Sequence, residues 1–518
     1  IDIDLLAVQL SALTLFVKSK EFNKDASITH SNLVSADVVL PAEEELNDFF
    51  QEMDFQRPVY KRLIQSMWKE LQNAEQLGSL LRLEDVLQKM IQDEYQEFNR
   101  EQPELEDYQN YRDAYTGCED YWEILDMQIL QAFDEFARRR ANTGNDASFF
   151  TGEAKKGFEL LHLMNGRYDV VVTNPPYMTR RNMNKTLANF LKDSYPNSKG
   201  DLYAAFIERC SEFLNEHGRL AMITQQSFMF ISSYEKMRES LREKFAIESL
   251  PHLGPRAFDE ISGEKVNTTL FSLRRESDEN RRKNAIGTYF RLINEPDCNA
   301  KRRAYEDALA NLSAAESDRR VYQRRQSDFD AIPGSPWSYW LQNSVKEVFR
   351  KFFSFSDFAK PAVGQNTGDN FRFLRYWWEV GIPLIQRQCY TLKECEKCSE
   401  KWFPYMKGGS FKRWYGNQEY VINWKCNGTE VKAYAVIRNN GRHWSRYLQN
   451  LKYLFRRGVT WSDLTSGRFA ARLSPSGFIF DVKGSSAFPD NPEFVLGVLN
   501  SSFTHYALTL LNPTVSFQ

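Results

Sequence analysis

The sequence lacks both an apolar run of membrane-spanning length and a regular cysteine framework. A helix needs about 20 consecutive apolar residues to cross a bilayer, so the first absence argues against an integral membrane protein. The seven cysteines are irregularly spaced, which argues against a disulfide-stapled secreted domain and favours a reducing cytoplasm. With 518 residues, 42% of them hydrophobic and 26% charged, we expect a monomeric globular protein of several domains.

Net charge is also nearly absent, since the balance is −2 at pH 7. The total hides a basic segment over residues 401–460, in which Glu419 and Glu430 are the only acids and aromatic residues alternate with the cations. Positive charge interleaved with aromatic faces is typical of a DNA-binding surface, although surface lysines of a β-rich domain are the alternative, and we favour DNA binding. The candidate contacts here are Lys407, Lys412, Arg413, Trp414, Arg442, Arg456 and Arg457.

The most informative stretch covers residues 168–177, which read YDVVVTNPPY. Its β-branched run predicts a buried strand of a parallel sheet, apolar on both faces. Pro175 and Pro176 have no N–H for a ladder, so the chain must leave the sheet at the strand's carboxyl end, where open α/β sheets bind ligands. Asn174 and the Pro175 carbonyl then offer two acceptors to one amino group, and Tyr177 offers a face for stacking. A plain strand followed by an extended turn is the alternative.

The Asn-Pro-Pro-Tyr stretch resembles motif IV of the amino-group DNA methyltransferases, in the form that points to N6-adenine. Other stretches resemble the PglX family, the adenine-specific methyltransferases of BREX phage-defence systems. The resemblance implies that Asn174, Pro175, Pro176 and Tyr177 form the catalytic motif. It also implies S-adenosyl-L-methionine as cofactor, double-stranded DNA as substrate and other BREX proteins as partners. The other stretches are GRLAMITQQSF (218–228), GQNTGDN (364–370), KWFPY (401–405), KGG (407–409), WY (414–415) and NPTVSF (512–517).

The same resemblance implies cofactor contacts near residue 1. Asp2, at the tip of a strand, would hold the cofactor's ribose, and Ile3 would pack on its adenine. Asp4 would cap the helix that follows. Asp37 would accept a hydrogen bond from the cofactor's adenine amino group, or else cap a turn at the end of its own strand. Asn174 would contribute to the cofactor site from the motif IV strand.

Two further elements are expected near the target base. Phe258 precedes a late hairpin strand, where related enzymes place an aromatic residue opposite the motif IV tyrosine; a core phenylalanine is the alternative. The two rings would sandwich the adenine. The polar stretch 178–196 carries Arg180 and Arg181, and we expect a mobile loop that closes over the base or contacts its phosphates.

Alternating strand and helix patterns predict a doubly wound α/β sheet of the Rossmann-like methyltransferase type, incomplete at its N-terminus. The late strands are expected over 218–224 and 267–273, and helices over 201–208 and 234–245. We predict a methyltransferase core over 1–40 and 151–275, a helical insertion over 41–150, a helical connector over 276–345, and a mixed α+β target-recognition domain over 346–518.

Four cysteines invite a zinc interpretation, because Cys395 and Cys398 have CxxC spacing. The pair is single, however, and Cys389 and Cys426 are irregularly placed, so we predict no metal. The six histidines show no ligand spacing.

One element that the resemblance implies is missing, namely the glycine-rich motif I that should precede Asp2. The sequence looks cut at both ends, and we expect a fragment that binds S-adenosyl-L-methionine weakly or not at all. Two other functions stay open. One is a methyltransferase–nuclease fusion of a restriction-modification system, and the other is a non-catalytic DNA-binding subunit of a defence complex.

Overall fold

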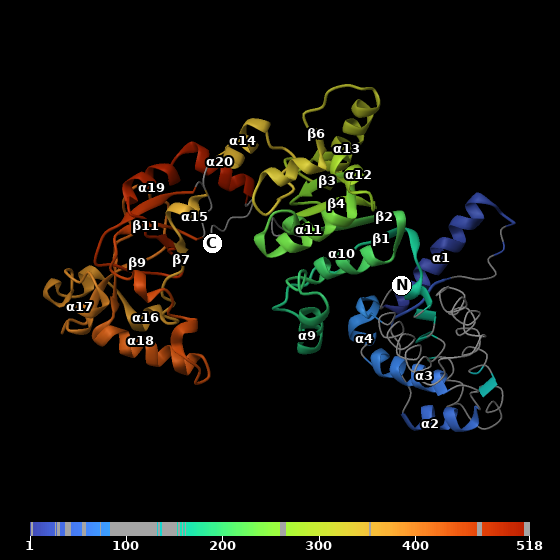
Figure 1. Cartoon of the computed structure of the whole chain (residues 1–518), viewed down its shortest axis with the longest axis horizontal. Helices are drawn as coiled ribbons and strands as arrows, with labels where there is room; N and C mark the ends of the chain where they lie inside the picture. The colour runs from blue at the N-terminus through green and yellow to red at the C-terminus, as the bar shows by residue number, and fades with distance from the viewer. Residues whose placement is uncertain are drawn as a thin grey trace, which may run out of the picture. The chain divides into compact units, whose positions relative to one another are not determined.

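A computed structural model divides the chain into two compact units (Figure 1). The first unit comprises Ile1–Gln225 and Ser240–Val321, and the second comprises Gln226–Glu239 and Tyr322–Gln518. The residues that the structure describes are 1, 4–25, 27, 32–36, 43–53, 58–72, 74–82, 166–259, 266–351, 354–463 and 469–511, with a few positions between 132 and 165.

A six-stranded mixed sheet has the order β1-β2-β4-β3-β5-β6, and its first five strands in this order lie in the first unit. β1 runs parallel to β2 and β3 runs parallel to β5, whereas β4 is antiparallel to both of its neighbours. A mixed sheet with helices confirms the predicted α/β class. The strands are β1 (Tyr168–Thr173), β2 (Leu214–Gln225), β3 (Phe245–Gly254), β4 (Thr268–Arg275), β5 (Ile286–Arg291) and β6 (Val321–Arg325).

The helices that follow β1 begin at polar N-cap residues. The Asp201 carboxylate accepts from the Tyr203 N–H at 3.4 Å and starts α10, which packs on β2. Asn184 and Asp297 cap α9 and α13 in the same way. The helices predicted over 201–208 and 234–245 are confirmed as α10 and α11. The bounds are α9 (Lys185–Ser194), α10 (Leu202–Glu212), η2 (Gln226–Met229), η3 (Ser232–Tyr234), α11 (Glu235–Lys244), α12 (Glu279–Asn284) and α13 (Cys298–Ser313).

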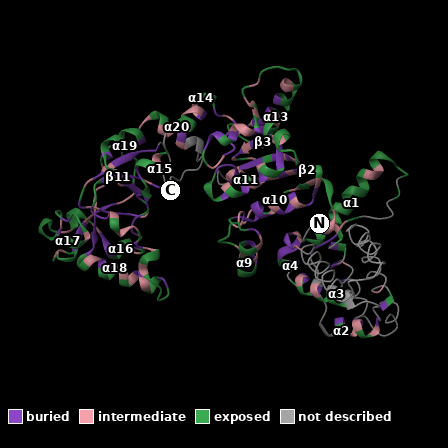
Figure 2. Cartoon of the chain, in the orientation of Figure 1, coloured by how far each residue is buried: buried purple, intermediate pink, exposed green. Residues whose placement is uncertain are grey.

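The start of the chain is helical where it is described. Asp4 caps the first helix by accepting from the Leu6 N–H at 2.9 Å, as the sequence predicted. Figure 2 shows this helix exposed along its length. Within the described ranges, no helix combines the length and apolarity that crossing a membrane requires. The bounds are α1 (Leu5–Phe22), α2 (Glu43–Glu52), α3 (Pro58–Leu71), α4 (Ala74–Leu77) and η1 (Gly78–Leu80). The helical pattern read between residues 86 and 133 lies almost entirely outside the described residues.

The burial of β1 differs from the prediction. Its place is as expected, but Val170 is 60% exposed and Val172 is 71% exposed. Within the described part of the chain only β2 pairs with β1, so β1 lies at an edge of the sheet. The prediction of a strand buried on both faces was therefore wrong. A β-branched run sets the strand conformation, but the number of neighbours that cover it is a tertiary property.

The stretch 276–345 also differs from the prediction of a helical connector. It contains α12 and α13, but it also contributes β5 and β6 to the sheet. These two strands are short and carry charged residues among the apolar ones, so their alternation was hidden by the surrounding charge. The predicted domain boundaries stay predictions.

The second unit contains two four-stranded sheets, in the orders β13-β9-β10-β8 and β12-β11-β14-β7. Large aromatic residues such as Trp424 and Tyr405 fill the core of the first sheet, and β11 is buried throughout (Figure 2). The strands are β7 (Pro361–Ala362), β8 (Leu374–Tyr376), β9 (Trp402–Met406), β10 (Tyr420–Asn423), β11 (Gly458–Trp461), β12 (Ala471–Ser474), β13 (Ile479–Phe480) and β14 (Ser486–Ala487).

Helices and short 3₁₀ turns connect these strands. Together with the two sheets they give the mixed α+β content that was predicted for this part of the chain. Their bounds are η4 (Gln326–Ala331), α14 (Asn343–Lys351), α15 (Phe355–Phe358), α16 (Asn370–Phe373), η5 (Trp377–Glu379), η6 (Ile382–Leu384), α17 (Leu392–Glu396), α18 (Lys425–Arg438), η7 (Trp444–Arg446), η8 (Leu451–Tyr453), α19 (Pro492–Leu499) and α20 (Ser502–Leu511).

Candidate active site and nucleic-acid interface

The chain leaves the sheet directly after Thr173, the last residue of β1. Asn174 is exposed, Pro175 is buried and Pro176 is exposed. β1 and β2 are parallel, so the carboxyl ends of both strands meet at the same edge of the sheet, beside this turn. The buried proline fixes the backbone, and the Asn174 carboxamide remains accessible to a ligand at the edge where α/β sheets bind small molecules.

Tyr177 is held in place by contacts from two directions. Its hydroxyl donates to the Ile223 carbonyl of β2 at 3.2 Å. Its ring lies edge-on to the Tyr203 ring of α10, with centroids 6.1 Å apart and an interplanar angle of 80°. The residue is half-buried, and burial raises the pKa of its hydroxyl to about 12. Tyr177 is therefore a neutral, oriented ring close to Asn174 in the chain.

The segment after Tyr177 is tied to the N-terminus of α10. The buried Asp201 carboxylate accepts from the Met178 N–H at 3.1 Å, and the Leu202 N–H donates to the Met178 carbonyl at 3.0 Å. The Arg180 N–H donates to the Gly200 carbonyl at 3.1 Å. Burial raises the pKa of the Asp201 carboxyl. The sequence predicted a mobile loop over 178–196, whereas the structure contains α9 there and ties the start of the segment to residues 200–202.

Arg180 and Arg181 lie on the exposed part of that segment. Neither makes an ion pair with an acid among the described residues, so both guanidinium groups are accessible to a phosphate. Phe258 is half-buried, four residues after Gly254, the last residue of β3. Its stacking opposite Tyr177 stays a prediction.

The remaining predicted cofactor residues cannot be placed. Asp2, Ile3 and Asp37 lie outside the described residues. Of the predicted set, Asn174 alone is located by the structure. The buried residues Val34 and Ala36 of the 31–40 segment belong to the same hydrophobic cluster as Leu202 and Val171.

A rigid, basic and aromatic loop spans 407–417 of the second unit. The Trp414 N–H donates to the Ala471 carbonyl at 3.0 Å, and the Leu473 N–H donates to the Trp414 carbonyl at 2.9 Å. Trp414 adopts φ +74° although it is not a glycine, and its ring is 50% exposed. A non-glycine residue in this region of φ is strained, and the role of Trp414 as a DNA contact stays a prediction.

The other predicted DNA contacts differ in their surroundings. Lys412 and Arg413 are exposed beside Trp414. The Lys407 ammonium lies 4.6 Å from the centre of the Tyr420 ring. Arg456 is exposed. Arg457 forms an ion pair with Glu493, which neutralises its charge and makes it less suited to contact a phosphate.

Sequence inspection missed an exposed aromatic stack next to this loop. The Tyr376 ring stacks on Trp378, with centroids 4.5 Å apart, and on Tyr420, with centroids 4.8 Å apart. Trp378 is 56% exposed. The run Tyr376-Trp377-Trp378 was a visible signal, but its partner comes from another strand. Stacked exposed rings beside a lysine are suited to contact nucleic acid bases.

Among the described residues, the thiols of Cys389, Cys395 and Cys398 lie close enough to interact with one another, and the prediction of no metal stays a prediction. Cys389 and Cys395 are buried free thiols, and burial raises the pKa of Cys389 to about 11. Over the described ranges, the one group with three ligand atoms within 4.8 Å of one another is Glu216, His217 and Glu276. In that group the Glu276 carboxylate accepts from the Arg274 guanidinium at 2.6 Å, as a structural ion pair would.

Comparison with known proteins shows which enzymes this chain is similar to. A family profile described as the Eco57I restriction-modification methylase matches residues 1–258. The chain is 39% identical over 359 residues to the adenine-specific methyltransferase PglX of Lacticaseibacillus casei (strain Zhang). It is 34% identical over 361 residues to the adenine-specific methyltransferase BrxX of Escherichia coli O9:H4 (strain HS). Over the matched stretches the chain is similar to PglX. The matched residues 1–258 include the Asn-Pro-Pro-Tyr turn, so the resemblance seen in the sequence is confirmed.

The PglX-like chain spans less than a third of these relatives. Each match covers 68% of the chain, but only 29% of PglX and 27% of BrxX. A shorter match, 31% identical over 123 residues, covers 23% of the chain and 12% of RM.Eco57I of Escherichia coli, a type II restriction enzyme and methyltransferase.

Solved structures of restriction-modification enzymes also match this chain, among them the following two. One is a nuclease-deletion mutant of the type ISP restriction-modification enzyme LlaGI with a DNA substrate mimic, at 14% identity and a TM-score of 0.41. It covers 71% of this chain and 35% of that one. The other is the type IIL restriction-modification enzyme MmeI with DNA, at 11% identity and a TM-score of 0.40. It covers 66% of this chain and 43% of that one.

Proposed function

We propose that the PglX-like chain belongs to a site-specific DNA methyltransferase that transfers a methyl group from S-adenosyl-L-methionine to the N6 amine of a flipped-out adenine. The observation that carries this proposal is the turn after β1. It presents an accessible Asn174 carboxamide on a proline-fixed backbone, next to the oriented ring of Tyr177. The names of the relatives support the same reaction, since both PglX and BrxX are adenine-specific methyltransferases.

The turn would act by positioning the amine. The N6 nitrogen is a weak nucleophile because its lone pair is delocalised into the purine ring. Hydrogen bonds from its two hydrogens to the Asn174 oxygen and the Pro175 carbonyl favour a pyramidal nitrogen, whose lone pair can then attack. Tyr177 would hold the purine plane by stacking. Fixed acceptors of this kind need no reorganisation during the reaction, which is the usual source of electrostatic catalysis.

When bound, the cofactor would supply an electrophilic methyl group on a sulfonium, which would leave as a neutral thioether, and the methylated amine would then release one proton to solvent. Asn174 fits a role beside it, since its polar side chain is accessible at the carboxyl end of β1. Asp2 and Ile3 would bind its ribose and adenine, and Asp37 its adenine amino group.

The second unit would supply contacts to duplex DNA. The rigid loop 407–417 presents Lys412, Arg413 and Trp414, and the stack of Tyr376, Trp378 and Tyr420 lies on β8, β10 and the turn after β8. Cations would neutralise phosphates while the rings contact bases. In the PglX-like context, host-DNA modification and phage exclusion with other BREX proteins would follow, in the cytoplasm.

The test is long-read methylome sequencing of cells that carry the full-length protein or its Asn174→Ala variant. Loss of the Asn174 acceptor should reduce N6-adenine methylation by about two to three orders of magnitude, as for other lost transition-state hydrogen bonds. Asn215→Ala is the matched control, because Asn215 is half-buried on β2 and its amide donates to Asp169 at 3.1 Å. Full methylation in the Asn174→Ala strain would point instead to a non-catalytic DNA-binding subunit.

The similarity to RM.Eco57I, a combined restriction enzyme and methyltransferase, favours a second candidate. In a fusion of that type, the full-length protein would also cut unmodified DNA when Mg²⁺ is added. Incubating it with unmethylated phage DNA, with and without Mg²⁺, decides between the two functions.

A further inference from the structure

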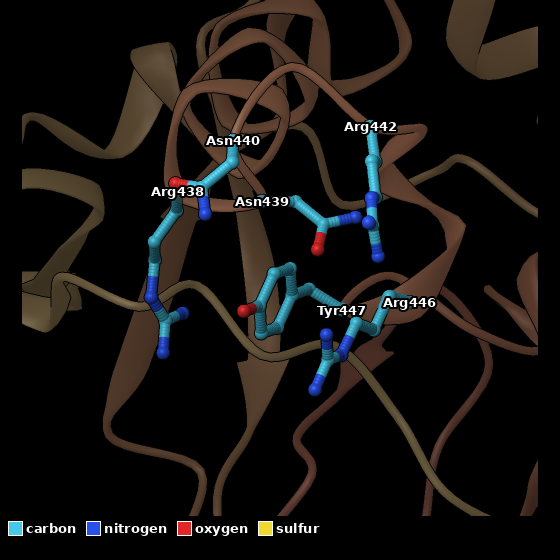
Figure 3. A pocket seen from close by; sticks show the side chains of 6 residues that line it. All are labelled: Arg438, Asn439, Asn440, Arg442, Arg446 and Tyr447. Atoms are coloured by element: carbon cyan, nitrogen blue, oxygen red, sulfur yellow. The ribbon is translucent and has the colours of Figure 1, made fainter. Parts of the chain in front are cut away.

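A cavity of about 350 Å³ lies in the second unit, lined by Arg438, Asn439, Asn440, Arg442, Arg446 and Tyr447 (Figure 3). Arginine and asparagine supply nearly all of its polar lining, and no acidic side chain is among the lining residues. Figure 3 shows three guanidinium groups arranged around the Tyr447 ring. The cavity therefore concentrates positive charge with planar hydrogen-bond donors.

The three arginines that line the cavity are not paired with acidic residues in the described part of the chain. Within the described ranges, none of Arg438, Arg442 and Arg446 forms an ion pair, whereas Arg372 of the same unit pairs with Glu430 at 3.1 Å. All three are exposed. The Arg438 guanidinium lies 4.5 Å from the centre of the Tyr447 ring, and that of Arg446 lies 5.8 Å from it. Three unpaired cations around one ring repel one another, so an anion between them would relieve that repulsion.

The GQNTGDN stretch at 364–370 contacts two residues that line this cavity. The Asn366 N–H donates to the Tyr447 carbonyl at 2.9 Å, and its side-chain oxygen accepts from Arg438 at 3.3 Å. Gly368 has φ +74°, and a Cβ at this position would collide with the Arg438 guanidinium. The buried Gln365 donates to the Gln449 carbonyl at 2.7 Å. This motif, to which the proposed reaction gives no role, thus orients Arg438 and Tyr447.

We infer that this cavity binds one phosphate group of the DNA backbone. Guanidinium forks match the geometry of phosphate oxygens, and phosphate contacts fix the register of a protein on DNA without reading its sequence. The inference rests on the proposed DNA substrate, because the same chemistry would also accept free inorganic phosphate or a nucleotide. It assigns Arg438, Arg446 and Tyr447 to the DNA interface in addition to Arg442.

The experiment measures DNA affinity of the full-length protein as a function of salt concentration, for the wild type and a triple variant with Arg438→Gln, Arg442→Gln and Arg446→Gln. Loss of one phosphate contact should lower the magnitude of the slope of log K against log salt by about 0.9. Each single variant should weaken binding on the order of tenfold, as expected for one lost charged hydrogen bond. Arg438→Lys should keep the slope but bind less tightly, because it keeps the charge and loses the fork.

The matched control removes three exposed cations of the same unit that lie outside the cavity, through Lys360→Gln, Arg387→Gln and Lys393→Gln. An equal drop in slope for this control and for the triple variant would show that only bulk charge matters, and would overturn the inference. Thermal unfolding checks that both variants are folded, and the single variants replace the triple one if it is not.

Two further measurements distinguish between the possible ligands of the cavity. They also distinguish failure of the phosphate site from failure of the proposed reaction. Isothermal titration with inorganic phosphate and with a mononucleotide should show no binding below the millimolar range; tight binding of either, with an unchanged DNA slope in the variants, would overturn the DNA assignment. Methylome sequencing of the triple variant should find the same methylated sequence at lower occupancy. An unchanged slope with normal methylation would refute the phosphate site alone, whereas methylation by the Asn174→Ala variant would refute the proposed reaction alone.

Discussion

Tyr177 illustrates how single residues of this site are oriented by distant parts of the chain. Its hydroxyl is bonded to Ile223 and its ring is flanked by Tyr203, both from elements that follow it in sequence. The stacking face and the anchoring hydroxyl therefore have separate roles. Substitutions can remove one and keep the other.

At this scale we predict different effects for Tyr177→Phe and Tyr177→Ala. Phenylalanine keeps the stacking face, so methylation should fall only a few-fold. Alanine removes it and should weaken binding of the target base by about 1–3 kcal/mol. A fluorescent 2-aminopurine at the target position measures base binding, and equal losses for both variants would contradict the stacking role. Because the pKa of Tyr177 is raised to about 12, its hydroxyl should cause no change in rate between pH 7 and pH 10.

Local sequence patterns predicted which residues stand at the turn, because the strand and the two prolines that end it are adjacent. The contacts that orient them were not predictable in this way. Tyr177 meets Ile223 across 46 residues, and Arg438 meets Asn366 across 72. Such pairs depend on how elements pack, which one sequence without relatives does not encode in any short window.

At the scale of elements, α10 does more than cover the sheet, because its N-cap residue also holds the segment that follows the active-site turn. Asp201 is buried and accepts from both Tyr203 and Met178. Its raised pKa means that the folded state binds this proton more tightly than the unfolded chain, so the ionised carboxylate costs stability at neutral pH.

We therefore expect Asp201→Asn to be at least as stable as the wild type at pH 7, since it keeps the acceptor without the buried charge. Asp201→Ala loses a helix cap and a second hydrogen bond, and should cost about 2 kcal/mol. Its methylation rate should also fall, because Met178 next to Tyr177 is released. Urea unfolding and single-turnover methylation measure the two effects, and a stable, fully active alanine variant would show that the cap does not position the turn.

The strand β3 carries a buried histidine, His252, whose pKa burial lowers from 6.5 to about 3. Above pH 6.5 the side chain is neutral in both the folded and the unfolded state, and it makes no pH-dependent contribution. As the pH falls below 6.5, the unfolded chain takes up a proton that the folded protein does not, so stability is lost. At pH 5 this loss should be about 2 kcal/mol.

His252→Gln, which does not titrate, should remove that part of the acid sensitivity. Urea unfolding of the unit that contains β3, at pH 7 and pH 5, tests this. The wild type should lose about 2 kcal/mol more than the variant between the two pH values. Equal losses would mean that His252 titrates normally.

Elements were predicted best where their pattern was strong, as for α10, α11, β2 and β4. The predictions were wrong where tertiary context decides. The burial of β1 depends on what pairs with its second side, and β5 and β6 are too short and too charged to stand out from the helices around them.

At the scale of the whole molecule, the proposed chemistry lies in the first compact unit, whereas all the proposed DNA contacts except Arg180 and Arg181 lie in the second, and each unit has its own hydrophobic clusters. Charge asymmetry along the sequence predicted which unit carries the cations, because composition is a property of a segment rather than of a fold. It did not predict the arginine cavity, since Asn366 and Arg438 become neighbours only through folding.

The exposed valines of β1 should affect how this chain behaves during purification. Val170 and Val172 point from a strand that, in the described part of the chain, has a partner on one side only. An exposed apolar edge strand promotes self-association. At high protein concentration we therefore expect aggregates of variable size rather than a dimer of fixed size. Val172→Lys should keep samples monodisperse in dynamic light scattering, whereas Ile286→Lys, at a residue that is 61% exposed on β5, should not.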